Sequence, residues 1–142
     1  MIRAFSPGDE KSIATLEAEC FSSPWSEAAI LESTDNNTAF IVFEENGRVQ
    51  GYAGLQIVLD EGYVTNIAVT KTARGRGIGQ SLVESLIKLA QEKGLAFISL
   101  EVRQSNVPAI SLYAKCGFKD VGKRKNFYQN PTEDAVIMTK EF

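Results

Sequence analysis

The sequence predicts a fold of the α/β (α+β) class, with elements in the order β-α-α-β-β-β-α-β-α-β-β over 142 residues. Two patterns carry this prediction. Apolar residues at three- and four-residue steps indicate helices with one buried face, and short runs rich in β-branched residues indicate strands. A chain of this length can bury roughly 70% of its unfolded surface, which is enough for one core. We therefore expect a single domain over residues 1–142.

Capping and turn residues mark the element boundaries in the first half of the chain. Ser26, followed by Glu27, is typical of a helix N-cap, and Asn46-Gly47 strongly favours a tight hairpin turn. The first helix places four residues on one face: Ile13, Leu16, Glu17 and Cys20. The predicted elements are strands at 2–5, 38–44, 49–59 and 61–69, and helices at 9–21 and 27–32.

Glycine and proline mark the boundaries in the second half. Gly94 and Gly117 fit helix C-caps, and Pro108 fits a first helical turn. The long helix shows a buried stripe that includes Ile78, Leu82 and Leu86. The predicted elements are helices at 78–93 and 107–116, and strands at 96–102, 118–124 and 135–139.

A glycine-rich turn, Arg74-Gly75-Arg76-Gly77-Ile78-Gly79, joins the strand at 61–69 to this long helix. Free N–H groups at a helix start, reinforced by the helix dipole, make a phosphate site. A loop without a ligand is the alternative, but Lys71, Arg74 and Arg76 favour an anion. The turn is not a P-loop, because Gly79-Gln80-Ser81 lacks the lysine, and its glycines do not have the G-x-G-x-x-G spacing of a dinucleotide site.

The composition excludes several kinds of chemistry. The chain has no histidine, so Ser-His-Asp and Cys-His catalysis are excluded and the commonest zinc ligand is missing. Cys20 and Cys116 are not in metal-ligand spacing, and we expect both to pack as small apolar residues. The net charge of −3 argues against broad nucleic-acid binding. No signal peptide or membrane-length apolar run is visible, which predicts a cytosolic (cytoplasmic) protein without membrane association.

The glycine turn, read as Arg74-x-x-Gly77-x-Gly79, resembles the acetyl-CoA pyrophosphate loop of the GNAT superfamily of N-acetyltransferases. The resemblance covers the whole chain and implies the GNAT fold, a mixed, mostly antiparallel central sheet of about seven strands flanked by helices. It narrows to the RimI-like branch, the ribosomal-protein-alanine N-acetyltransferases. The segments that carry it are Pro24-Trp25-Ser26, Asn66-Ile67-Ala68-Val69, Leu100-Glu101-Val102-Arg103-Gln104-Ser105-Asn106, Leu112-Tyr113-Ala114-Lys115-Cys116-Gly117-Phe118 and Arg124-Lys125-Asn126-Phe127-Tyr128.

The resemblance implies acetyl-CoA as co-substrate and no metal. The main chain of Ile67, Ala68 and Val69 is expected to pair with the pantetheine arm as an extra strand. Asn106 matches a position that contacts CoA, the alternative being a cap of the next helix. The pyrophosphate is expected to contact, mostly through backbone N–H groups, residues Arg74, Gly75, Arg76, Gly77, Ile78, Gly79 and Gln80.

Two residues are candidates for acid–base catalysis. Glu101 stands where its strand passes from apolar to polar residues, at the end where ligand clefts form. The resemblance implies that Glu101 is the general base, directly or through water, for an amine that attacks the thioester in a ternary complex. It implies that Tyr113 is the general acid that protonates the leaving thiolate. The alternatives are an outward-facing or ion-paired Glu101 and a core aromatic at Tyr113.

The acceptor side is expected to be aromatic. Trp25, Phe127 and Tyr128 either wall the peptide N-terminus or close a small core. The acceptor that the resemblance implies is the N-terminal alanine of a small-subunit ribosomal protein, with no direct contact to nucleic acid. Lysine side chains, other protein N-termini and a non-catalytic acyl-CoA sensor are the alternatives. A monomer is the simplest expectation, and the sequence leaves the oligomeric state open.

Overall fold

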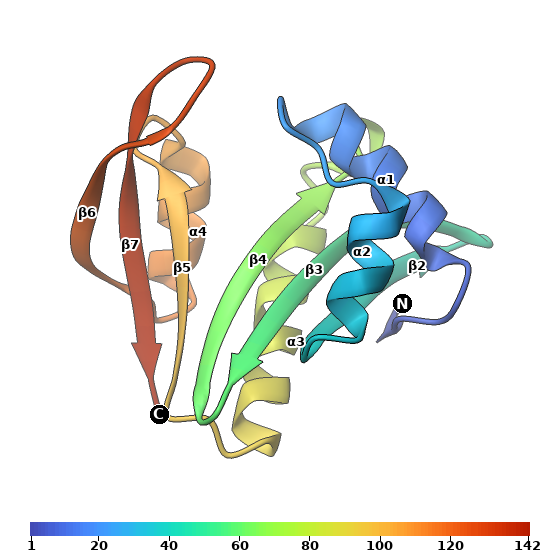
Figure 1. Cartoon of the computed structure of the whole chain (residues 1–142), viewed down its shortest axis with the longest axis horizontal. Coiled ribbons are helices and arrows are strands. Elements are labelled where there is room, and N and C mark those ends of the chain that lie inside the picture. The colour runs from blue at the N-terminus through green and yellow to red at the C-terminus, as the bar shows by residue number, and fades with distance from the viewer.

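The computed structural model describes all 142 residues and contains one seven-stranded sheet with helices on both faces (Figure 1). The strand order is β1-β2-β3-β4-β5-β7-β6, and every neighbouring pair is antiparallel except β4 and β5. The strands are β1 (Ile2–Ala4), β2 (Thr38–Glu45), β3 (Arg48–Val58), β4 (Glu61–Val69), β5 (Phe97–Arg103), β6 (Lys119–Tyr128) and β7 (Glu133–Glu141). The helices are α1 (Asp9–Cys20), α2 (Glu27–Thr34), α3 (Ile78–Glu92) and α4 (Val107–Lys115). The predicted fold class and element order are confirmed.

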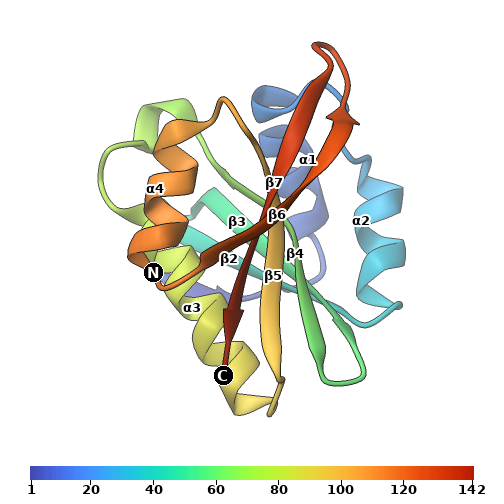
Figure 2. The ribbon, with the colours of Figure 1, turned by 90° about the vertical axis from the view of Figure 1, so that its left-hand side faces the viewer.

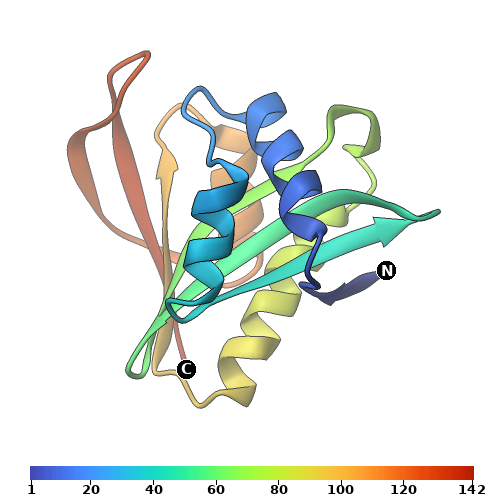
Figure 3. The same ribbon diagram turned by 45° about the vertical axis from the view of Figure 1, so that its right-hand side comes forward.

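The core is divided between the two faces of the sheet. Figure 3 shows α1 and α2 on one face and α3 on the other. Leu82 and Leu86 of α3 are buried in the larger cluster with Leu55 of β3. Ile13 of α1 is buried in the smaller cluster with Tyr52 of β3. Tyr52 and Leu55 belong to different clusters because successive residues of a strand point to opposite faces of the sheet. No helix of the structure is both long enough and apolar enough to cross a bilayer.

The predicted turn and cap residues adopt the conformations that their positions require. Asn46 and Gly47 have φ angles of 55° and 74°, the left-handed pair of a two-residue hairpin turn. The Ser26 hydroxyl accepts a hydrogen bond from the Ala29 N–H at 3.1 Å and caps α2. Gly94 and Gly117, with φ angles of 69° and 97°, follow α3 and α4. The local signals in the sequence therefore located the ends of these elements correctly.

The largest differences from prediction lie at the C-terminus. Strand β6 runs to Tyr128 rather than to residue 124, and β7 spans Glu133–Glu141 rather than 135–139. Beyond Arg124 the strand continues with the polar residues Lys125 and Asn126, and its register with β7 shifts between the pairs Arg124–Ala135 and Tyr128–Glu133. A short 3-10 turn at Lys71–Ala73, which the sequence did not predict, leads from β4 into the glycine loop.

Strands β4 and β5 pair only at one end. Their parallel register has three pairs, Glu61 with Phe97, Gly62 with Ile98 and Tyr63 with Ser99, after which the strands separate (Figure 1). Figure 2 shows the same sheet from the side of β6 and β7. A bulge in β4 follows this point, since Thr65 and Asn66 together lie opposite the single residue Gly54 of β3. A bulge bends its strand and increases its twist. The bulge therefore contributes to the opening between β4 and β5.

We predict that Gly54→Ala destabilises the protein. A Cβ at this position would lie 2.3 Å from Thr65 Oγ1 and 2.8 Å from the buried Phe40 ring, so the bulge must shift. We expect a loss of about 1–3 kcal/mol in the free energy of unfolding, measured by urea denaturation. Gly79→Ala is the matched control, because its Cβ meets only Leu112 Cδ2 at 3.6 Å. Equal stability losses in the two variants would contradict the prediction.

Candidate active site

A cleft of about 660 Å³ opens where β4 and β5 separate. Its walls come from both strands, the segment between α1 and α2, helix α4 and the end of β6 (Figure 1). The structure brings together in this lining seven of the residues that the sequence singled out: Trp25, Ile67, Glu101, Asn106, Tyr113, Phe127 and Tyr128. Ala68, Val69 and the loop of residues 74–80 lie outside the lining, where β4 ends and α3 begins.

The glycine loop presents a row of unoccupied backbone donors. The N–H groups of residues 75–80 donate to no protein acceptor, and the first bonded N–H of α3 is that of Ser81, which donates to Gly77 at 3.0 Å. Gly75 and Gly77 have φ angles of 82° and 80°, which turn successive N–H groups toward one side. This is the geometry of an anion-binding nest at a helix N-terminus. The residues present therefore fit a pyrophosphate group.

The arginine side chains of the loop are engaged within the protein. Arg74 donates to the Val69 carbonyl at 3.0 Å and to Cys20 Sγ at 3.3 Å, and its own N–H donates to Lys71 at 3.4 Å. Arg76 forms an ion pair with Glu45 at 2.6 Å and lowers the pKa of that carboxyl. The unoccupied donors of residues 75–80 are consequently backbone N–H groups.

The edge of β4 that faces the cleft has no strand partner beyond Tyr63. In an antiparallel pair, alternate residues turn their N–H and C=O away from the partner, here β3. The Thr70 N–H donates to the Gln50 carbonyl of β3, so the backbone groups of Thr70 face β3. The backbone groups of Ile67 and Val69 therefore face away from β3, and the Val69 carbonyl accepts from Arg74 on that side. Ile67 thus has both backbone groups available to an extended ligand, while the carbonyl of Val69 is already used.

Glu101 lines the cleft and is also ion-paired. Its Oε2 accepts a hydrogen bond from Arg124 Nη1 at 3.0 Å, and its Oε1 accepts none. The side chain is 31% exposed. The ion-pair alternative therefore describes this carboxylate, and its role as general base stays a prediction.

Tyr113 and Tyr128 line the same cleft in apolar surroundings. Burial raises the pKa of Tyr113 to about 12, with a further contribution from Tyr128. Burial, and then the charge of Glu101, raises the pKa of Tyr128 to about 12. Tyr113 also packs against Phe118, with ring centroids 6.0 Å apart, so it is both a packed aromatic and a cleft residue. At neutral pH its phenol is protonated and can donate a proton.

Asn106 has the cap role that was expected as the alternative, and its contact with CoA stays a prediction. Its Oδ1 accepts from the Ala109 N–H at 3.2 Å and so caps α4, and the residue also lines the cleft. Phe127 and Tyr128 meet edge to face, with centroids 5.0 Å apart, at the end of β6. They face the cleft together with Trp25 from the opposite wall.

The sequence analysis missed two residues that position this site. Glu17 is fully buried and accepts hydrogen bonds from Tyr52, from Asn66 Nδ2 at 3.1 Å and from the Trp25 N–H at 2.9 Å. A charged residue on the predicted apolar face of α1 was the available signal. Arg103 donates to the carbonyls of the β6–β7 turn and lies over the Tyr128 ring at 4.6 Å. Nothing in the sequence pattern indicated that contact.

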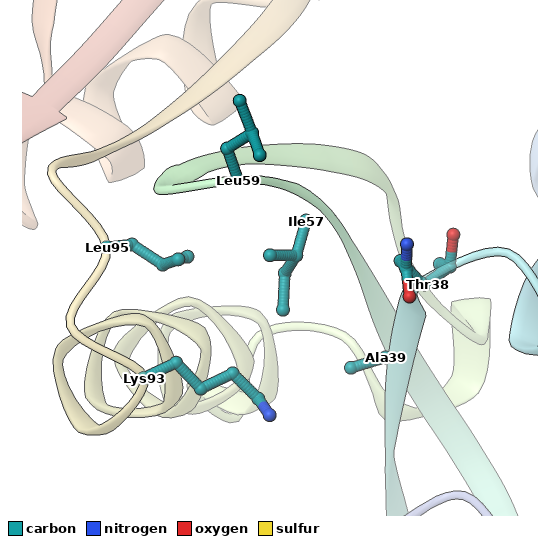
Figure 4. A pocket seen from close by; sticks show the side chains of 7 residues that line it. Thr38, Ala39, Ile57, Leu59, Lys93 and Leu95 are labelled. Carbon is teal, nitrogen blue, oxygen red and sulfur yellow. The ribbon is translucent and has the colours of Figure 1, made fainter.

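A second hollow, of about 570 Å³, is lined by residues from the start of β2, the end of β3 and the segment after α3. Figure 4 shows Lys93 reaching across it beside Ile57 and Leu95. It contains no carboxylate, phenol or thiol, so it offers no acid–base pair. No group of three or more carboxylate or thiol side chains is arranged to hold a metal ion anywhere in the structure.

The seven-stranded sheet, the donor nest and the cleft lined by Glu101 and Tyr113 are the arrangement expected of an N-acyltransferase. The chain belongs to the acetyltransferase (GNAT) family, whose family model matches residues 10–118. It is accordingly an acyltransferase, and the resemblance found in the sequence is confirmed.

Relatives in this family share most of the chain. A Bacillus subtilis protein provisionally named [ribosomal protein bS18]-alanine N-acetyltransferase is 41% identical over 92% of this chain and 87% of its own length. The Escherichia coli (strain K12) protein of that name is 36% identical over 87% of this chain and 84% of its own. The crystal structure of the ribosomal-protein-S18-alanine N-acetyltransferase from Escherichia coli superimposes with a TM-score of 0.92 at 33% identity, covering 99% of this chain and 92% of that one.

We predict that Tyr113 makes stability fall at alkaline pH. A phenol whose pKa rises from 10 to about 12 on folding stabilises the native state fully below pH 10, and that stability is lost as the pH rises toward 12. The urea midpoint should therefore fall above pH 10, and it should fall less steeply in Tyr113→Phe. Urea denaturation of both proteins at pH 8, 10 and 11 measures this. Lysine side chains titrate in both proteins and contribute equally to the pH dependence. Identical slopes of the urea midpoint against pH would therefore mean that the Tyr113 phenol is in contact with water.

Proposed function

We propose that the protein is an acetyl-CoA-dependent α-amino acetyltransferase that modifies the N-terminal alanine of ribosomal protein bS18 in the cytoplasm. The observation that carries the proposal is the single cleft lined by both Glu101 and Tyr113, with the donor nest of residues 75–80 just beyond the end of β4. The acceptor is taken from the names of the relatives, which are 36–41% identical to this chain.

Each part of acetyl-CoA has a counterpart in the structure. The nest of residues 75–80 would hold the pyrophosphate, and the free edge of β4 at Ile67 would pair with the pantetheine arm. Asn106 would contact the ligand from the start of α4. When bound, this co-substrate supplies an acetyl group activated as a thioester.

Glu101 and Tyr113 divide the proton transfers. An ammonium group is no nucleophile, so Glu101 accepts a proton from the acceptor amine, directly or through water. The amine nitrogen forms a bond to the acetyl carbon in a ternary complex, and the carbon–sulfur bond breaks. Tyr113, protonated because its pKa is raised to about 12, donates its proton to the leaving thiolate. The products are an N-acetylated peptide and CoA.

The acceptor side favours an α-amine over a lysine side chain. An α-amino group has a pKa of about 8 and lysine one of about 10.4, so at neutral pH the α-amine is unprotonated roughly a few hundred times more often. Trp25, Phe127 and Tyr128 surround the acceptor side of the cleft with aromatic rings. These walls would admit a small N-terminal residue and hinder a long side chain.

We predict that Gly77→Val weakens acetyl-CoA binding by at least about tenfold, or about 1.4 kcal/mol. Gly77 has a φ of 80° in the middle of the nest, and a branched side chain there would disturb the loop and block the pyrophosphate. Calorimetric titration of acetyl-CoA measures the change. Gly94→Val is the matched control, since Gly94 has a φ of 69° at the other end of the same helix. Equal affinity in the two variants would mean that the phosphates bind elsewhere.

We predict that peptides beginning with alanine are acetylated at the terminus, and that peptides with a blocked terminus and an internal lysine react far more slowly. The reason is the difference in amine pKa together with the aromatic walls. Mass spectrometry of both peptides after incubation with the protein and acetyl-CoA measures the two rates. Comparable rates would indicate a lysine acetyltransferase instead.

The same assay tests the two catalytic roles. Glu101→Gln and Tyr113→Phe should each lower kcat by roughly 10²–10⁴, the range for general acid–base residues. Binding of acetyl-CoA should remain nearly intact, because the nest lies outside the cleft lining. If both variants keep near-full turnover at saturating substrate, Glu101 and Tyr113 do not have these roles.

A further inference from the structure

Arg124 is the only protein group that donates a hydrogen bond to the Glu101 carboxylate. Both side chains lie on the same face of the sheet, because Ala135 of β7 pairs with Arg103 on one side and Arg124 on the other, and Glu101 is two residues from Arg103. Arg124 Nη1 donates to Glu101 Oε2 at 3.0 Å, which leaves Oε1 without a partner. One oxygen of this carboxylate is therefore hydrogen-bonded within the protein, and the other has no hydrogen-bond partner there.

The guanidinium of Arg124 is itself held in place. It lies over the Phe127 ring at 4.8 Å, a cation–π contact with one of the aromatics on the acceptor side. Its side chain makes no other hydrogen bond. Arg103, on the same face, is already used by Glu133 and by two carbonyls of the β6–β7 turn. Arg124 alone is thus placed to orient Glu101.

Stability does not account for this ion pair. Arg124 is 55% exposed and Glu101 31% exposed. Pairs this open to solvent contribute about 0–1 kcal/mol, because water screens the charges and ordering two side chains costs entropy. The contact is more informative for the orientation that it imposes than for the energy that it supplies.

We propose that Arg124 is a positioning residue that holds Oε2 of Glu101 so that Oε1 faces the acceptor amine. Stacking on Phe127 fixes the guanidinium, and the guanidinium fixes the rotation of the carboxylate. Its positive charge also disfavours the ammonium form of an amine bound beside it. This inference rests on the proposed function, since it assumes that Glu101 accepts the proton.

A double-mutant cycle tests the proposal with an alanine-initiated peptide as acceptor. We expect Arg124→Gln to lower kcat by about tenfold or more, a part of the contribution of a general base. The affinity for acetyl-CoA and the urea midpoint should stay unchanged. In the Glu101→Gln background, Arg124→Gln should have no further effect on kcat, because its target is gone. Arg124→Lys should recover only a small part of the lost turnover, since it keeps the charge but loses the planar group that stacks on Phe127.

Lys123→Gln is the matched control, because it removes the same charge from an exposed position one residue earlier on β6. It should leave kcat unchanged. An equal loss in Lys123→Gln would mean that only net charge matters, and full or increased turnover in Arg124→Gln would overturn the positioning role. A full additional loss in the Glu101→Gln background would also overturn it. If the wild-type protein does not acetylate the peptide at all, the proposed function itself fails.

Discussion

The separation of β4 from β5 after three paired residues is the constraint on which the site depends. Two features hold the strands in this arrangement. Gly62 lets the paired end approach closely, since a Cβ there would lie 2.9 Å from Leu95 Cδ1. The bulge at Thr65 and Asn66, which only the absence of a side chain at Gly54 permits, lies just beyond the last pair. Beyond the last pair this edge of β4 has no strand partner, so an extended ligand can pair with it and extend the sheet there. The loop that follows β4 then turns its N–H groups toward the end of the same ligand.

The site also requires that the two walls of the cleft keep fixed positions relative to each other. The buried side chain of Glu17 connects them. Its carboxylate receives donors from β3, from the bulge of β4 and from the segment that carries Trp25. Burying a charged group is costly unless hydrogen bonds compensate. The three neutral donors supply that compensation, and burial together with this contact raises the pKa of Tyr52. The segment that carries Trp25 and the free edge of β4 are therefore joined through one buried side chain.

Local signals predicted most of the fold, and a resemblance predicted most of the site. The turn at Asn46-Gly47 and the cap at Ser26 could be located because a few neighbouring residues decide such features. The length of β6 could not, because its end lacks apolar alternation, and the last residue of the strand, Tyr128, belongs to the sheet through its pair with Glu133 of β7. The same limit applies to the site. Glu101 and Tyr113 were found as residues, but contacts with Arg124, Arg103 and Glu17 join segments far apart in sequence, and no local pattern specifies them.

The roles proposed for Glu101 and Tyr113 would allow a chain without histidine to separate the acid from the base. Tyr113 lies among apolar side chains, and burial raises its pKa to about 12, which keeps the phenol protonated. Glu101 is partly exposed and accepts a hydrogen bond from the Arg124 guanidinium. The two groups therefore lie in different surroundings, one among apolar side chains and one beside a charge. Proposals for acid and base follow from such differences in environment. A histidine could change its charge near neutral pH, whereas the Tyr113 phenol stays protonated across the range in which an α-amine becomes a nucleophile.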